Sequence, residues 1–182
     1  MSVTNLSALP ALYAGQGRVR QIIDGVLPVG VTLLYGPSGV GKTGLAVATT
    51  MAVAAGRPWA GRAVERGPVL YVAAENHMGV RDRLHAAACI AGSHQLAVTI
   101  ADREEATTLS QPNGHAAIER AVEGAAYGSP RLIVIDTLAT AFGSGSQDDS
   151  GPATTFMNNM EALSAKYECA VLVVHHTAMD SK

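Results

Sequence analysis

Cysteine, lysine, aromatic side chains and charge are all scarce in this chain of 182 residues. Its two cysteines, Cys89 and Cys169, lie far apart in apolar surroundings. That spacing excludes a disulfide framework or a zinc site and predicts buried, reduced thiols. Charged residues make up 15% of the chain and the net charge is −2, which excludes a strongly cationic nucleic-acid-binding protein. A hydrophobic content of 48% excludes a disordered chain.

Long apolar runs are also absent. The most apolar segments are too short to span a bilayer, and no basic segment precedes an apolar core at the N-terminus. We therefore expect a soluble, cytoplasmic protein that has no membrane partner. The length predicts one domain over residues 1–182, in which residues 1–20 form an N-terminal extension.

The sequence does contain a regular alternation of apolar, β-rich runs with helical segments. Continuous runs of Val, Ile and Leu are typical of strands buried on both faces of a parallel sheet. The alternation predicts an α/β fold, a three-layer α-β-α sandwich with a mostly parallel sheet that binds its ligands at the carboxyl ends of the strands. We also expect a surface loop at 56–68 and a mobile loop at 143–151. The expected strands are 31–35, 69–74, 98–100, 132–135 and 170–174, and the expected helices are 42–55, 79–91, one with Ile118, Val122 and Ala125 on its apolar face, and one with Phe156, Met160, Leu163 and Tyr167.

A glycine-rich segment between the first of these strands and the first helix matches G-x-x-x-x-G-K-[ST] at every fixed position. Glycines allow successive backbone N–H groups to point at phosphate oxygens, and the start of the helix adds its dipole. Lys42 supplies a positive charge to the β- and γ-phosphates, and the Thr43 hydroxyl binds Mg²⁺. The alternative, a glycine-rich turn that precedes a lysine by chance, is disfavoured by the flanking strand and helix. The segment predicts a nucleoside-triphosphate site made of Gly36, Pro37, Ser38, Gly39, Val40, Gly41, Lys42 and Thr43.

Two acidic residues follow other expected strands. Asp136 ends the run 132–135, where a P-loop protein places its second magnesium residue, although an aspartate there could instead cap the next turn. Glu75 ends the run 69–74, where a carboxylate can orient a water for in-line attack on the γ-phosphate. The alternative for Glu75 is a solvated acid at the start of a turn. Because Thr137 rather than glutamate follows Asp136, proteins whose water-activating carboxylate directly follows the metal aspartate are a poor match.

A pair of histidines, His175 and His176, ends the run 170–174. Because side chains alternate along a strand, we expect only one of the two to face the site. A histidine in this place can bind the γ-phosphate and report its loss, and the alternative is a buried or capping pair. A metal site is disfavoured because no third ligand lies at a recognisable spacing.

Taken in order, five segments resemble the RecA-like P-loop ATPase core, and most closely the AAA ATPase core of plasmid and phage replicative helicases of the RepA type. The resemblance covers most of residues 20–178. The glycine-rich loop alone is generic, whereas the set in this order is specific. The matching segments are Asp24–Pro28, Gly36–Thr43, Tyr71–Glu75 followed by Arg83 and Leu84, Val134–Ala139, and Val173–Thr177.

The resemblance implies a role for each candidate residue. Lys42 and Thr43 would bind ATP and Mg²⁺, with Asp136 as the second magnesium residue. Glu75 would be the catalytic base that activates water, and His176 the phosphate sensor. These roles are those of an ATP-hydrolysing core.

The resemblance also implies a homo-oligomer, usually a hexameric ring, with ATP between subunits and single-stranded DNA in the centre. In the family, the double-histidine strand is followed by more sheet with an arginine that reaches the neighbouring subunit's ATP. The chain ends at Lys182 and no arginine matches that role, so we expect the family's C-terminal portion to be missing. The loop at 143–151 carries Asp148 and Asp149 and no basic residue, which weakens the DNA expectation.

The favoured function is thus the ATP-hydrolysing core of a RepA-type hexameric DNA helicase or a related DNA-replication ATPase. The alternative is a nucleotide-switched assembly or regulatory module with little turnover, which the lack of a matching arginine favours. A small-molecule kinase has thin support from Arg81 and Arg83. A translation or signalling GTPase is less favoured still, because the sequence has no N-K-x-D motif for guanine.

Overall fold

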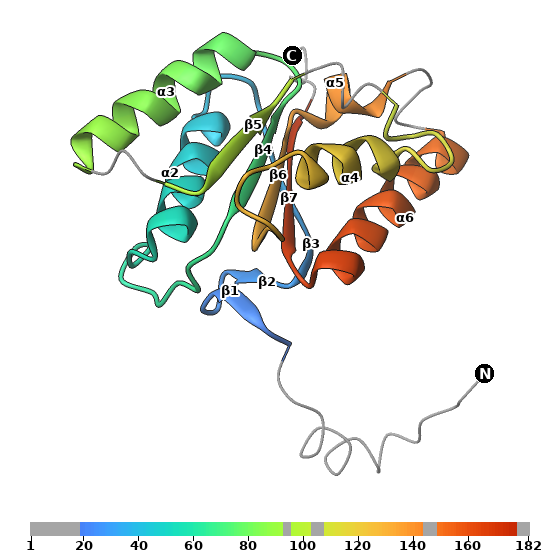
Figure 1. Cartoon of the computed structure of the whole chain (residues 1–182). Helices are drawn as coiled ribbons and strands as arrows, with labels where there is room; N and C mark the ends of the chain where they lie inside the picture. Colours follow the sequence, from blue (N-terminus) through green and yellow to red (C-terminus); the bar gives the residue numbers. More distant parts are fainter. Residues whose placement is uncertain (1–18, 93–95, 103–107, 144–148, 178–182) are drawn as a thin grey trace, which may run out of the picture.

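The structure is a computed structural model, and it describes residues 19–92, 96–102, 108–143 and 149–177. Its centre is a five-stranded sheet in which every pair of neighbouring strands is parallel. Helices cover both faces, so the predicted α/β three-layer sandwich of the RecA-like P-loop type is confirmed (Figure 1). In spatial order the strands are β3 (Gly30–Gly36), β7 (Ala170–His176), β6 (Leu132–Asp136), β4 (Val69–Ala73) and β5 (Val98–Ala101).

The helices divide between the two faces of the sheet. On one face lie α2 (Lys42–Ala55) and α3 (His77–Ile90), which pack with the hydrophobic cluster that contains Tyr71. The other face is covered by α4 (His115–Glu123), α5 (Leu138–Phe142) and α6 (Ser150–Tyr167). Among the described residues, none of these helices has the length and apolar character that crossing a bilayer would need.

The central strands are buried because both of their faces are apolar. Along β4, Val69, Tyr71 and Ala73 pack toward α2 and α3, whereas Leu70 and Val72 pack toward α6. All five residues of β4 and all five of β6 are buried. This burial explains why both strands are recognisable as continuous apolar runs.

At one edge of the sheet, β3 is much less covered. Within the described part of the chain, no strand pairs with its outer side. The Leu33 and Tyr35 side chains are 50% and 67% exposed. Next to them, an apolar hollow of about 120 Å³ lies between β3, the start of α2 and the turn that contains Val26.

Several details differ from the sequence-based expectations. A short hairpin, β1 (Gln21–Ile23) and β2 (Leu27–Pro28), precedes the sheet and was not predicted, and α5 was also missed. Both are too short for a periodic pattern to show. The loop predicted at 143–151 is wrong at its end, because α6 already begins at Ser150; positions 144–148 lie outside the described residues, as do positions 1–18 of the expected extension.

Two further expectations need correction. The strand β7 continues through His175 and His176 instead of ending at Val174, and its last residues pair with Tyr35 and Gly36. Cys169 is buried, and burial raises the pKa of its thiol to about 12. Cys89 is exposed, contrary to the prediction, because the end of α3 faces solvent, where Ile90 is also exposed.

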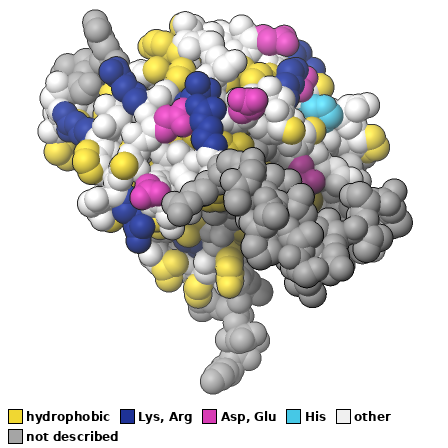
Figure 2. Space-filling view, turned by 90° about the horizontal axis from the view of Figure 1, so that it is seen from below, with side chains coloured by type: hydrophobic (Ala, Val, Ile, Leu, Met, Phe, Trp, Pro, Cys, Tyr) yellow, Lys and Arg dark blue, Asp and Glu magenta, His cyan; other side chains and the backbone are white. Residues whose placement is uncertain are grey.

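An ion cluster ties the hairpin to the amino ends of the central strands. Glu65 accepts hydrogen bonds from the Arg20 guanidinium and lies 2.8 Å from Nε of Arg131, which directly precedes β6. The bond from Arg20 lowers the pKa of Glu65 below its ordinary value of 4.5. Seen from below, basic and acidic side chains are interspersed on this end of the molecule and form no large patch of one sign among the coloured residues (Figure 2).

Candidate nucleotide-binding site

The glycine-rich loop joins β3 to α2 at the carboxyl end of the sheet. Gly39 and Gly41 have φ angles of 83° and 92°, in the left-handed region that favours glycine. A Cβ at either position would meet no atom within 4 Å, so backbone conformation rather than space requires glycine here. Gly41 is the N-cap residue of α2, and no side chain caps the helix, which leaves the N–H groups of its first turn available to a phosphate.

Lys42 is the first residue of α2 and is only 5% exposed. Its Nζ donates hydrogen bonds to the carbonyl oxygens of Gly36 at 2.8 Å and Pro37 at 2.6 Å. The ammonium group therefore lies inside the loop, against the backbone that would surround a phosphate. Among the described residues, Lys42 is the only lysine near the loop, since the other described lysine, Lys166, lies on α6.

The strand order explains how the remaining candidates come together. Because β7 lies between β3 and β6, the end of β7 stands between the loop and Asp136. In the register of the sheet, Gly36 pairs with His176, and Val174 pairs with Asp136. An open pocket of about 210 Å³ forms at this point, lined by Ser38, Gly39, Thr43, Glu75, Asn76, Val80, Arg83, Asp136 and His176.

Hydrogen bonds fix the two carboxylates of the pocket. The Tyr71 hydroxyl donates to Oδ2 of Asp136 at 2.6 Å. The Thr137 hydroxyl donates to Oε2 of Glu75 at 2.9 Å. The backbone N–H of Ala74 also donates to the Asp136 carbonyl at 2.8 Å, so the ends of β4 and β6 are joined through both backbone and side chains.

The two histidines occupy different places. His176 lines the pocket, and its Nε2 lies 3.8 Å from Oε2 of Glu75. His175 is not among the lining residues, as expected from side-chain alternation along a strand. Burial lowers the pKa of His175 below its usual 6.5, and the neighbouring His176 and Lys42 act in the same direction. His175 is therefore neutral at pH 7.

Burial also governs Tyr71, whose side chain is fully inaccessible. Burial raises the pKa of its phenol well above the usual 10, and the negative charge of Asp136 adds to this effect. The hydroxyl thus stays protonated and acts as a donor to Asp136, which is itself buried.

The donor set of the pocket fits a magnesium–nucleotide complex. Thr43 and Asp136 offer hard oxygen ligands of the kind that Mg²⁺ prefers. No group of three or more His, Cys, Asp or Glu that could hold a metal exists among the described residues. Mg²⁺ commonly takes one or two protein ligands and completes its shell with phosphate oxygens and water, and Thr43 and Asp136 would supply two such ligands.

Sequence reasoning assigned no role at this site to several residues, Tyr71, Asn76 and Arg83 among them. The sequence pattern indicates only that Tyr71 belongs to an apolar strand. A buried tyrosine hydroxyl needs a hydrogen-bond partner, and that requirement is the signal that could have drawn attention to it. Asn76 caps α3, its Oδ1 accepting from the N–H of Gly79 at 2.9 Å. Arg83 follows Asn76 and Val80 at the sequence spacing that places residues on one face of a helix. It therefore also lines the pocket.

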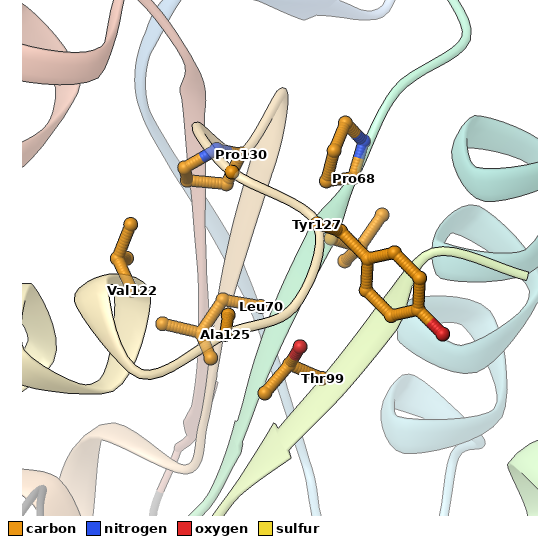
Figure 3. A pocket seen from close by; sticks show the side chains of 9 residues that line it. Pro68, Leu70, Thr99, Val122, Ala125, Tyr127 and Pro130 are labelled. Carbon is orange, nitrogen blue, oxygen red and sulfur yellow. The ribbon is translucent and has the colours of Figure 1, made fainter.

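A second hollow, at the opposite ends of the strands, does not compete with this site. Its wall includes Leu70, Val122 and Ala125, with Tyr127 and two prolines at the rim (Figure 3). Its volume is about 10 Å³, which holds on the order of one water molecule. It therefore has no room for a ligand.

The loop geometry and the strand order define the class of the protein. A glycine-rich loop between a strand and a helix, with an aspartate at the end of a strand two places along a parallel sheet, makes a P-loop nucleotide-binding domain of the RecA-like type. A family model described as an AAA domain matches residues 9–182. The chain belongs to this family, and it is a nucleotide-binding P-loop ATPase core.

Proposed function

We propose that this ATPase core belongs to a RepA-type hexameric DNA helicase or a related DNA-replication ATPase. The observation that carries the proposal is the meeting of Thr43, Asp136, Glu75 and His176 in one pocket beside the glycine-rich loop. Loop, carboxylates and histidine come from the ends of four different segments, in the order that the resemblance to replicative helicases predicts. This is the set that couples nucleotide binding to hydrolysis in that resemblance.

In this proposal each residue acts on the bound nucleotide. Lys42 neutralises charge on the β- and γ-phosphates, and Thr43 and Asp136 hold Mg²⁺. When bound, Mg²⁺–ATP supplies the electrophilic γ-phosphorus. Glu75 orients a water for in-line attack and accepts its proton, while His176, 3.8 Å from Glu75, responds to the γ-phosphate.

The proposed partners are further copies of the chain and single-stranded DNA. The pocket is open to the surface, so a neighbouring subunit could cover it and contribute an arginine. Arg83, the arginine that lines the pocket, donates to the carbonyl of Gly79 on its own helix at 3.0 Å. A ring adds the small DNA contacts of its subunits together, which is how a domain with a net charge of −2 could hold DNA.

The proposal is tested by steady-state ATP hydrolysis at high protein concentration, with and without single-stranded DNA. We expect hydrolysis that DNA stimulates and that Lys42→Ala abolishes. Tight ATP binding without turnover in either condition would instead favour a nucleotide-switched assembly module. Wild-type turnover in Lys42→Ala would reject the assignment of the site itself.

A further inference from the structure

Two hydroxyl groups link β4 and β6 in a reciprocal way. Tyr71 of β4 donates to the carboxylate of Asp136 at the end of β6, at 2.6 Å. Thr137, directly after β6, donates to the carboxylate of Glu75, just beyond the end of β4, at 2.9 Å. Each strand thus supplies the hydroxyl that holds the other strand's carboxylate.

The pairing of the two strands does not by itself require these bonds. Their backbones are already joined in register over their whole length, from Val69 opposite Leu132 to Ala73 opposite Asp136. A phenylalanine at 71 or a valine at 137 would fill nearly the same space and would leave no buried hydroxyl to satisfy. Polar groups in such positions cost desolvation energy unless they are bonded, which points to a purpose beyond packing.

The surroundings of the two carboxylates differ in a way that suits two tasks. Tyr71, Thr137 and Asp136 are all almost completely buried, so Asp136 has one oxygen fixed in the interior. The Glu75 side chain is 55% exposed, and without a partner it could adopt many rotamers. An ionised carboxylate only accepts hydrogen bonds, so both hydroxyls act as donors that set its orientation.

We propose that Tyr71 and Thr137 are positioning residues of the nucleotide site. Tyr71 holds one oxygen of Asp136 and leaves the other for the cation. Thr137 holds Glu75 in the orientation that addresses the attacking water. This inference rests on the proposed function, which assigns Asp136 and Glu75 these roles.

The two halves of the proposal predict different defects. Tyr71→Phe should weaken the affinity of the nucleotide complex for Mg²⁺ by about tenfold, because partners that orient metal ligands typically matter at that level. It should leave the affinity for a fluorescent ATP analogue in EDTA unchanged.

Thr137→Val should lower kcat by about tenfold at constant KM, since a displaced base affects the reaction and not binding. Thr137→Ser keeps the hydroxyl and should restore kcat.

Matched controls separate positioning from general damage. Tyr127→Phe removes the hydroxyl of a half-exposed tyrosine at the opposite end of the sheet. Thr50→Val removes a buried hydroxyl of α2 that has no hydrogen-bond partner. Both controls should match the wild type in Mg²⁺ titration and in turnover. Thermal melts monitored by circular dichroism establish that every variant is folded.

Each outcome decides a part of the proposal. Wild-type Mg²⁺ affinity in folded Tyr71→Phe overturns the role of Tyr71, and a kcat of Thr137→Ser as low as that of Thr137→Val overturns the role of Thr137. Failure of the proposed function is visible in the wild type alone, as absent nucleotide binding or absent turnover. If the wild type binds but does not hydrolyse ATP, the Mg²⁺ titration of Tyr71→Phe still decides its half. If Tyr71→Phe does not fold, the variants Thr137→Val and Thr137→Ser still decide the half of the proposal that concerns Thr137.

Discussion

Glu75 and Asp136 lie at the carboxyl ends of neighbouring strands, yet the protein surrounds them differently. Asp136 is buried with one oxygen held by Tyr71, whereas more than half of the Glu75 side chain is exposed. A fixed, buried carboxylate suits a cation that must be held in one place. An accessible carboxylate suits proton transfer with a water molecule.

Replacing Glu75 tests this division at the reacting end. Glu75→Gln keeps the size of the side chain but cannot accept a proton, so we expect kcat to fall by about 100-fold or more while ATP binding is retained. Turnover and binding of a fluorescent ATP analogue measure the two effects separately. Loss of binding along with turnover would show that Glu75 has a structural role instead.

Asp136→Asn tests the cation-holding end. The amide has nearly the same shape, but it lacks the negative charge that Mg²⁺ favours, so we expect the Mg²⁺ requirement for tight ATP binding to rise on the order of tenfold. The readout is nucleotide affinity as a function of Mg²⁺ concentration. Asp82→Asn, an exposed change on α3, is the control. An unchanged titration in Asp136→Asn would reject the metal role.

At the scale of single elements, one buried side chain anchors the segment before α4. The Nδ2 group of Asn159, on α6, donates to the carbonyl oxygens of Leu109 and Gln111, both at 2.8 Å. Its Oδ1 lies 2.8 Å from Nδ1 of His115. Asn159→Ala would remove these bonds, including the one that the buried Leu109 carbonyl accepts, and we expect it to lower the free energy of unfolding by about 2 kcal/mol. Urea denaturation measures this, and the exposed neighbour Asn158→Ala should change it little.

The hairpin β1–β2 should respond to acid through Glu65. Arg20 lowers the pKa of Glu65 below 4.5, so the folded state holds the charged form more strongly than the unfolded chain does. This stabilisation is present above about pH 4.5 and is lost as pH falls toward the lowered value. We expect the melting temperatures of wild type and Glu65→Gln to differ most at neutral pH and to converge below pH 4.5. Glu161→Gln, on the exposed side of α6, should show no such pattern.

The elements that could be predicted from the sequence are those with a long, regular pattern. The helix α2 was predicted with its observed bounds, because the loop signature fixes its start and Gly56 its end. The central strands followed from their continuous apolar runs. The hairpin and α5 were not predictable in this way, because two to five residues cannot show a period and tertiary contacts stabilise them.

The site was predictable only as far as chain order places residues at strand ends. Glu75, Asp136 and the pair of His175 and His176 could be proposed because parallel strands bring their carboxyl ends to one edge, and the resemblance to replicative helicases then selected His176. Tyr71 and Thr137 could not be proposed, since the carboxylates to which their hydroxyls donate lie 65 and 62 positions away in the sequence. Such contacts depend on which strands become neighbours, and no local sequence pattern predicts the order β7, β6, β4.

At the scale of the whole molecule, the proposed ring makes a simple prediction about size. With a non-hydrolysable ATP analogue and single-stranded DNA, we expect sedimentation velocity to reveal a species near six times the chain mass of 18.7 kDa. Lys42→Ala should remain smaller, because it lacks the nucleotide that would sit between subunits. A monomer in all conditions would contradict the ring.

The uncovered side of β3 has a practical consequence for anyone who purifies this domain. Leu33 and Tyr35 lie beside a row of backbone hydrogen-bonding groups that have no partner strand in the described chain. This combination favours association between molecules. Attraction between apolar surfaces weakens on cooling and strengthens with sulfate or phosphate salts. We therefore expect concentrated solutions to aggregate most slowly at low temperature in chloride buffers of modest ionic strength. On warming, their turbidity should rise.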